Sequence, residues 1–163
     1  ELRDAIVATA RSAAARGARP VILTMAGETD RRFADAVRAA LDDAGLRDVT
    51  CEAIGPTPAA ALARLGRLSG LITVRLHGLL LGALAGVPSV PVAYDDKVHV
   101  AADRLGLGDL VVPLVDVSSV DLLQRLGAAG AVERRATVRA RVDALRSEAI
   151  DVATALMALG SRR

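Results

Sequence analysis

Aromatic side chains are almost missing from this sequence, which has one phenylalanine, Phe33, one tyrosine, Tyr94, and no tryptophan. Proteins that bind single-stranded nucleic acid stack bases on aromatic side chains, and this chain has almost none to offer. Acidic residues are interspersed with the basic ones, so the formal net charge is only +2 and no lysine-rich tail occurs. We therefore expect no nucleic-acid partner.

Cysteine and histidine are also scarce. Cys51 is the only cysteine, so no intramolecular disulfide and no cysteine metal cluster can form, which fits a reducing compartment. The two histidines, His77 and His99, have no cysteine or carboxylate at metal-ligand spacing. We expect neither a metal site nor a cofactor.

One long uncharged stretch, residues 78–94, could be mistaken for a membrane helix of roughly 20 residues. Gly86, Pro88 and Pro91 interrupt it, and proline inside a helix removes a hydrogen bond and clashes with the preceding turn. The pattern predicts a short helix, a turn and a buried strand. No charged-then-apolar signal segment opens the sequence either, so we expect a soluble, cytoplasmic domain.

Apolar runs alternate with helical stretches, the order typical of an α/β protein with a parallel sheet and helices on both faces. Gly27–Asp30 is predicted to be a turn, and Thr57 followed by Pro58 marks a helix start. The predicted strands are 20–25, 49–54, 71–74, 89–93 and 110–114. The predicted helices are 2–16, 30–44, 58–68, 78–85, 95–105 and 118–126, the last capped by Ser118 or Ser119.

The final helix has a different pattern. Its apolar residues follow four- and three-residue steps over three heptads: Val138, Val142, Leu145, Ala149, Val152, Leu156 and Leu159. We divide the chain into a domain at 1–130, ending in a small glycine hinge at 127–130, and a C-terminal helix at 131–163. That helix either lies on its own domain, crosses to a neighbouring domain, or pairs with a second copy in a homo-oligomer.

Ligands of open parallel sheets bind beyond the carboxyl ends of the strands. Arg75 and His77 follow the third strand two positions apart, so they point the same way, and Gly78 opens the next helix. A guanidinium, an imidazole and a free helix amino terminus make an anion site with a proton donor. The alternative is that Arg75 pairs with an acidic neighbour and His77 caps the helix.

Two further loops are candidates for this strand-end site. Tyr94 and Asp95 follow the fourth strand, and Lys97 is the only lysine in a chain whose other cationic side chains are arginine. A compact ammonium suits a phosphate oxygen where a planar guanidinium would not fit, although one position can also be chance. Tyr94 could stack on a ligand, donate its hydroxyl or face solvent. Glu28 and Thr29 follow the first strand.

The segment from Leu71 to Leu107 resembles the best-marked part of the polysaccharide pyruvyl transferase family: LITVRLHGLLLGALAGVPSVPVAYDDKVHVAADRLGL. An apolar strand leads into Arg-Leu-His, then a small-residue helix, Gly-Val-Pro, a second strand and a Tyr-Asp-x-Lys loop. The bacterial cell-wall pyruvyl transferases of the CsaB type look most similar. Asp96 stands where the family usually has proline, which loosens that loop.

The resemblance implies a Rossmann-like half of a two-domain GT-B-like enzyme that moves the pyruvyl group of phosphoenolpyruvate onto a cell-surface polysaccharide as a ketal. Arg75 would clamp phosphate or carboxylate, His77 would be the general acid or base, and Lys97 would assist the leaving phosphate. The expected partners are phosphoenolpyruvate, a glycan acceptor and a missing N-terminal domain. A lipid-linked acceptor would bring the enzyme to the inner face of the membrane.

The resemblance also implies that the chain starts after the first strand of the second domain, which would leave an exposed sheet edge or groove unless other residues fill it. Activity of this half alone is therefore in doubt. Two other functions stay open: a nucleotide-sugar glycosyltransferase or epimerase of the same two-half architecture, and a non-catalytic binding module.

Overall fold

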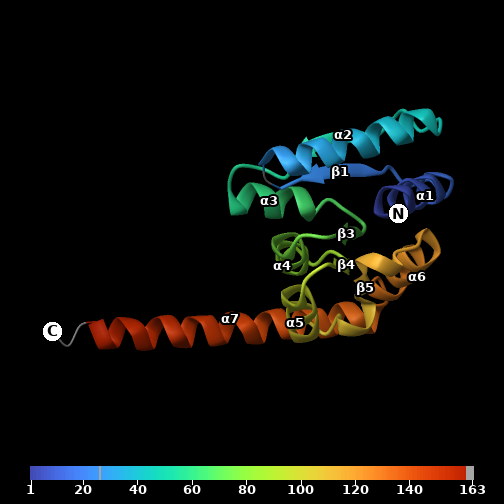
Figure 1. Cartoon of the computed structure of the whole chain (residues 1–163). Helices are drawn as coiled ribbons and strands as arrows, with labels where there is room; N and C mark the ends of the chain where they lie inside the picture. Colours follow the sequence, from blue (N-terminus) through green and yellow to red (C-terminus); the bar gives the residue numbers. More distant parts are fainter. Residues whose placement is uncertain (26, 161–163) are drawn as a thin grey trace.

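The computed structural model describes residues 1–25 and 27–160, except for the side chains of 155, 156 and 158–160. Helices and strands alternate along the chain (Figure 1). The helices are α1 (Leu2–Ala14), α2 (Gly27–Asp43), α3 (Pro58–Leu65), α4 (Leu76–Leu84), α5 (Asp96–Arg104), α6 (Ser119–Ala129) and α7 (Val132–Gly160). The strands are β1 (Val21–Thr24), β2 (Thr50–Ala53), β3 (Leu71–Thr73), β4 (Ser89–Ala93) and β5 (Val112–Pro113). The α/β class is thus confirmed.

Local sequence signals explain where several of these elements begin and end. Thr57 caps α3 by accepting a hydrogen bond from the Ala60 amide, with Pro58 as the first helical residue. Ser118 caps α6 in the same way. Gly86 follows the end of α4 with a φ of 72°, a left-handed conformation that glycine adopts without strain. These predicted signals are all confirmed.

Some predicted boundaries are wrong. Residues 27–30 are the first turn of α2 rather than a separate turn, and the acidic Glu28 and Asp30 suit that position at a helix amino terminus. Helix α4 starts at Leu76 and includes His77. Strand β5 has only two residues because 3₁₀ turns flank it on both sides, at Gly108–Leu110 and Leu114–Asp116. Gly127 lies within α6, so the predicted hinge narrows to the break after Ala129.

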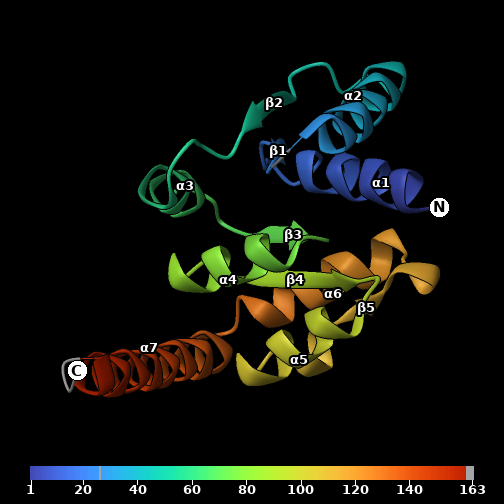
Figure 2. The same cartoon turned by 60° about the vertical axis from the view of Figure 1, so that its left-hand side comes forward.

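The strands form two sheets rather than the predicted single sheet of five. Strands β1 and β2 pair in parallel, and β3, β4 and β5 form a second parallel sheet in that order. Among the described residues no strand ladder and no backbone hydrogen bond joins β1 to β3. Helices α4 and α5 pack on the three-stranded sheet from one side and α6 from the other (Figure 2).

The main hydrophobic core surrounds β4, whose five residues are all buried. A second cluster joins α3 to parts of both sheets, and a third packs α2 against β1. Helix α1 contributes to two of these clusters: Leu2 and Ala5 pack with the three-stranded sheet, whereas Ile6 and Val7 pack with β1 and α2. Helix α1 therefore ties the two sheets together on one side.

Helix α7 projects well beyond the rest of the molecule (Figure 1). Its first half packs on the domain, where Val142 is buried and Val138 and Leu145 are partly buried against the main core. An ion pair between Arg104 and Glu148, 2.7 Å apart, joins α5 to α7 near the point where α7 leaves the domain. None of the helices in the described residues is long and apolar enough to span a membrane.

Candidate functional site

The carboxyl ends of β1, β3 and β4 bring three side chains together. Arg75 directly follows β3 as the N-cap residue of α4, in an extended conformation with φ −98° and ψ 128°. Thr73 holds this turn, because its hydroxyl accepts a hydrogen bond from the Arg75 amide at 3.1 Å. Asp30, in the first turn of α2, forms an ion pair with the Arg75 guanidinium. Two segments that are 45 residues apart in the sequence thus meet at the carboxyl ends of the two sheets.

Arg75 is held as a cation between two polar groups. The hydrogen bond to the Asp30 carboxylate is the main reason that the pKa of Arg75 is raised above its ordinary value, and Tyr94 adds a smaller interaction that acts in the same direction. Strands β3 and β4 pair in parallel, so the loops that follow them lie side by side, as predicted. Asp30 is 12% exposed, whereas the Arg75 side chain is 43% exposed. A guanidinium has five N–H donors, so an open Arg75 can bind Asp30 and still donate to a ligand.

His77 takes no part in this ion pair. It is exposed in the first turn of α4, and the structure gives it no hydrogen bond or ion pair within the described residues. Arg75 rather than His77 occupies the N-cap position, and its side chain makes no capping bond. The alternative prediction was that Arg75 pairs with an acidic residue and that His77 caps the helix. The structure shows the ion pair of Arg75 but no cap by His77.

Gly78 has a packing role at this position. It is buried, and a Cβ atom there would collide with the Thr73 hydroxyl and approach Met25 Sδ to 3.3 Å. Only a glycine lets α4 come this close to the end of β3. This contact fixes the direction in which α4 leaves Arg75.

Lys97 and Asp95 form the start of α5. The Asp95 carboxylate accepts a hydrogen bond from the Lys97 amide at 2.9 Å, which caps the helix, and also pairs with Lys97 Nζ at 2.9 Å. The hydrogen bond from the Lys97 amide is the main reason that the pKa of Asp95 is lowered. In turn, the hydrogen bond to the Asp95 carboxylate raises the pKa of Lys97. Lys97 remains more than half exposed. Its ammonium can therefore reach a ligand beside Tyr94.

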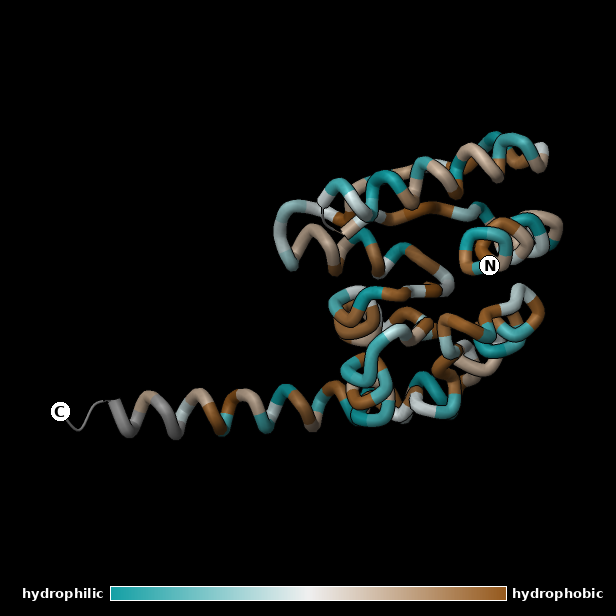
Figure 3. The backbone as a smooth tube through the Cα atoms, in the orientation of Figure 1, coloured by the Kyte–Doolittle hydropathy of each residue, from teal (hydrophilic) through white to brown (hydrophobic). Residues whose placement is uncertain are grey.

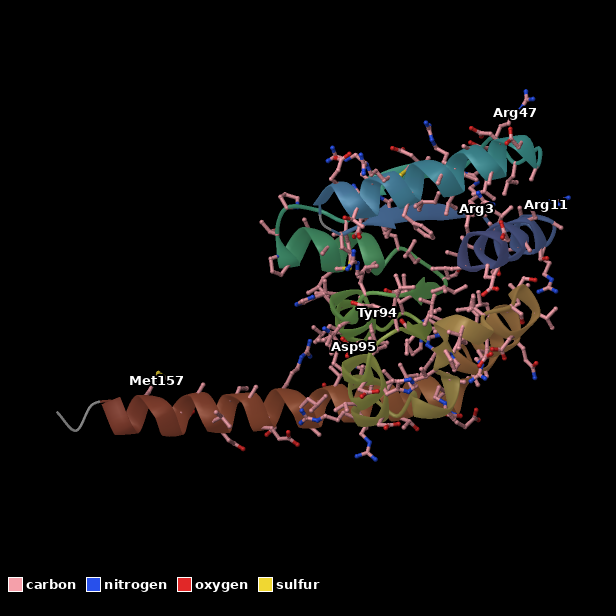
Figure 4. The ribbon with its side chains drawn as sticks, viewed as in Figure 1. Arg3, Arg11, Arg47, Tyr94, Asp95 and Met157 are labelled. Carbon is pink, nitrogen blue, oxygen red and sulfur yellow. The ribbon has the colours of Figure 1, made fainter. Side chains whose placement is uncertain are left out.

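A shallow depression of about 280 Å³ lies next to this loop, between the ends of β4 and β5. Tyr94 and Asp95 lie next to each other near the start of α5 (Figure 4). The lining residues are Ala93, Tyr94, Asp95, Asp96, His99, Pro113, Leu114 and Val115. Tyr94 belongs to both the depression and the Arg75 contacts, so it connects the two groups of candidate residues.

The remaining candidates, Glu28 and Thr29, are exposed in the first turn of α2. Glu28 pairs with Arg31 and Arg32 of its own helix at 4.0 and 3.6 Å, whereas the ion pair of Arg75 is with Asp30. The residue of this turn that does reach the strand-end site is Asp30, which our sequence analysis did not select. The signal that could have identified Asp30 is its position in the sequence. It is an acidic residue in the first turn of the helix that follows one strand, where it can meet an arginine at the end of a neighbouring strand.

The structure brings together Arg75, Asp30 and Tyr94, and it places Asp95 and Lys97 beside Tyr94. The described residues contain no group of three or more histidine, cysteine, aspartate or glutamate side chains that could hold a metal ion. Chemically, this edge presents two cations and a phenol to solvent, with carboxylates that position them. Such an arrangement can bind a small anion through charge-assisted hydrogen bonds.

Comparison with known proteins adds an independent observation. A family model described as "Polysaccharide pyruvyl transferase" matches residues 3–96, which include Arg75, His77 and Tyr94 but end one residue before Lys97. A search of curated proteins found no match. Because the family model covers more than half of the chain, the chain belongs to the polysaccharide pyruvyl transferase family.

Proposed function

We propose that this chain is the donor-binding half of an enzyme that transfers the pyruvyl group of phosphoenolpyruvate to a sugar of a cell-surface polysaccharide. The observation that carries the proposal is the exposed Arg75 guanidinium at the amino terminus of α4, inside the segment matched by the family. Phosphoenolpyruvate carries a carboxylate and a phosphate, and a helix amino terminus with an adjacent guanidinium favours such groups.

The reaction needs few protein groups. Two hydroxyls of one sugar form two C–O bonds to the central carbon of the enolpyruvyl group. The bond from that carbon to the phosphate oxygen breaks, and a proton adds to the methylene carbon to make a methyl group. One hydroxyl proton balances the proton gained by carbon, and the other leaves with phosphate.

The chain's residues fit these steps in separate roles. Arg75, oriented by Asp30, binds the carboxylate or phosphate, and Lys97 stabilises the departing phosphate beside Tyr94. His77 is exposed, so it can exchange a proton as the general acid for the methylene carbon or as the base for a hydroxyl. The acceptor sugar binds to a second, N-terminal half. The two halves face each other across a cleft, as in GT-B enzymes, and the Rossmann-like domain of this chain is the donor-binding half.

Titration calorimetry with two ligands tests this proposal. We expect phosphoenolpyruvate to bind and uridine diphosphate not to bind. Binding of uridine diphosphate alone would favour a nucleotide-sugar glycosyltransferase or epimerase, and binding of neither ligand would favour a non-catalytic module. Inorganic phosphate serves as the control, because a ligand recognised through both its carboxylate and its phosphate should bind more tightly than phosphate alone.

A further inference from the structure

Both cations of the strand-end site are paired with carboxylates. Arg75 pairs with Asp30, and Lys97 pairs with Asp95. Asp96, between Asp95 and Lys97, adds an exposed carboxylate to the same loop. A carboxylate that keeps its hold on a cation repels an anionic ligand that approaches the same cation. One of the two ion pairs therefore has to open if a ligand with several negative charges is to bind well.

The ion pair of Arg75 and Asp30 is a tertiary contact that fixes both partners. Asp30 lies in α2, 45 residues before Arg75, and its side chain is only 12% exposed. The second oxygen of the Asp30 carboxylate accepts a hydrogen bond from the Met25 amide at 3.3 Å, so the carboxylate is held from two sides. A guanidinium has five N–H donors, so Arg75 can bind a ligand without leaving Asp30.

The ion pair of Lys97 and Asp95 is local and open to water. The two residues are neighbours in one loop, and their side chains are 57% and 35% exposed. An exposed ion pair contributes little to stability, so opening it costs little free energy. The ammonium is carried by a flexible four-carbon stem, so it can turn away from Asp95 without any movement of the backbone.

The two oxygens of the Asp95 carboxylate have separate tasks. Oδ1 accepts the hydrogen bond from the Lys97 amide that caps α5, and Oδ2 contacts Lys97 Nζ, each at 2.9 Å. The backbone of Asp95 is extended, with φ −152° and ψ 143°, which is the usual conformation of an N-cap residue. Departure of the ammonium therefore leaves the cap in place.

Tyr94 lies within interaction range of both cations. The main cause of the raised pKa of Arg75 is its bond to Asp30, the main cause of the raised pKa of Lys97 is its bond to Asp95, and Tyr94 adds to both. The Tyr94 ring is 53% exposed and follows β4 directly (Figure 4). An anion bound to Arg75 beside this ring is within reach of the Lys97 ammonium.

We propose that Asp95 is a positioning residue that holds the Lys97 ammonium at the start of α5 and releases it to the phosphate group of a ligand bound by Arg75. This assignment rests on the proposed function, in which the ligand is phosphoenolpyruvate. Arg75 keeps its bond to Asp30 and acts as a fixed anchor, whereas Lys97 exchanges a carboxylate for a phosphate. Asp95 thus competes with the ligand and lowers the affinity of the site for anions.

Replacing Asp95 by asparagine separates the two tasks of its carboxylate. Asparagine also caps helices, but it lacks the charge that competes for Lys97. Asp95→Ser, which keeps a capping oxygen on a different side chain, is a second variant of the same kind. Asp96→Asn is the matched control, because it removes the same charge one residue further on and keeps the ion pair of Lys97 with Asp95. The amide of buried Val98 reports that α5 is intact in each variant.

Titration calorimetry with phosphoenolpyruvate gives the first readout. We expect Asp95→Asn and Asp95→Ser to bind phosphoenolpyruvate roughly two- to fivefold more tightly than the unchanged chain, the scale set by an exposed ion pair. Asp96→Asn should gain clearly less affinity. When Lys97→Met is also present, the gain from Asp95→Asn should fall to that of Asp96→Asn, because the ammonium that Asp95 restrains is gone.

The single lysine of the chain gives a second readout, since ¹³C labelling of lysine produces signals from Lys97 alone. We expect the signal of the labelled carbon next to Nζ to shift when phosphoenolpyruvate is added at neutral pH, because the ammonium exchanges a carboxylate for a phosphate. Asp95→Asn should shift this signal without any ligand, and Asp96→Asn should shift it much less.

The proposal is overturned if phosphoenolpyruvate binds but Asp95→Asn gains no more affinity than Asp96→Asn, or if the Lys97 signal stays unchanged at saturation. Weaker binding by Asp95→Asn would overturn it as well, and would mean that Asp95 holds Lys97 where the ligand needs it. If neither the unchanged chain nor any variant binds phosphoenolpyruvate, the proposed function itself is contradicted, and the role of Asp95 fails with it.

Discussion

Arg75 is the residue on which the proposed donor site depends most. Replacing it by lysine keeps one positive charge near Asp30 but removes the planar fork that binds a carboxylate or phosphate through two parallel bonds. We expect Arg75→Lys to weaken phosphoenolpyruvate binding by roughly tenfold or more, since a hydrogen bond to a charged group contributes about 1.5–3 kcal/mol. Titration calorimetry measures the change, and Arg104→Lys on α5 is the control. Unchanged affinity in a folded Arg75→Lys variant would contradict the site.

His77 should affect turnover rather than binding. In an enzyme that contains both halves, we expect His77→Ala to lower kcat by at least about 100-fold with a smaller change in donor affinity, the usual scale for a lost general acid or base. The exposed His99, which lines the depression beside α5, is the matched control. A His77→Ala enzyme that turns over normally would remove His77 from the mechanism and leave Arg75 untested by that result.

Lys97 allows a test that keeps the charge and changes only shape and hydration. Its ammonium is paired with Asp95 through one point contact at 2.9 Å, and a guanidinium is larger and planar. If the single lysine of the chain reflects a phosphate subsite beside Tyr94, Lys97→Arg should weaken phosphoenolpyruvate binding while the free energy of unfolding stays the same. Equal affinity of the two proteins for phosphoenolpyruvate would mean that the lysine is accidental.

The strand-end residues illustrate what the sequence could predict at this scale. Arg75 and Tyr94 were found because polar residues directly after apolar strands must emerge at one edge of the sheet. Asp30 was missed because its helix was predicted to start at the residue itself, which made Glu28 and Thr29 look like the loop residues. A shift of a helix start from residue 30 to Gly27 turns a different side chain toward the neighbouring strand, and pattern reasoning does not resolve such a shift.

At the scale of elements, the contact between α4 and β3 is the most constrained. We expect Gly78→Ala to destabilise the protein by about 1–3 kcal/mol, because the new methyl group overpacks against the Thr73 hydroxyl and Met25. Gly127→Ala is the matched control: Gly127 lies in helix α6 with nothing within 4 Å of the added Cβ, so this change should be neutral or stabilise by up to about 1 kcal/mol.

Denaturant unfolding of the variants measures both effects. If the clash with Thr73 is the cause, adding Thr73→Ala to Gly78→Ala should recover part of the loss, although Thr73→Ala alone removes the hydroxyl that accepts from the Arg75 amide. Additive losses in the double variant would show that the steric explanation of Gly78 is wrong.

Element type was predicted better than pairing. Caps such as Thr57 and Ser118 and the glycine after α4 are local signals, and the structure places them as expected. Strand pairing depends on which edges are adjacent in space, and five strands with no recognised break in the pattern predicted one sheet. The short β5 was also overestimated, because its apolar residues continue into 3₁₀ turns that remain part of the core.

At the scale of the whole molecule, α7 divides into a packed half and a projecting half. Val138, Val142 and Leu145 pack on the domain, whereas Ile150, Val152 and Met157 are between 60% and 69% exposed. Figure 3 shows hydrophobic segments that recur along the projecting part. Leu156 and Leu159, which continue the predicted heptad stripe, lie outside the described side chains. A helix whose apolar stripe continues past its own domain has surface to bury elsewhere.

The projecting half of α7 should therefore either fray or pair when the protein is studied alone. At roughly 25 cal/mol per Å² of apolar surface, leaving several large side chains in water costs several kcal/mol relative to burial, which is enough to favour association. At low concentration we expect amides beyond Ala149 to exchange rapidly. As the concentration rises, sedimentation should show a growing mass together with protection of the same amides.

Two variants separate this helix from the rest of the surface. Val152→Glu should abolish the concentration dependence, whereas Val132→Glu should leave it unchanged, because Val132 is also exposed but lies at the opposite end of α7. Ending the chain after Ala149 should give a monomer that retains the α/β domain, since the last residues of α7 that pack on the main core precede that point. A strict monomer whose α7 amides are protected to the end would show that the helix packs wholly on its own domain, and the idea that it crosses to another domain or pairs with a second copy would then fail.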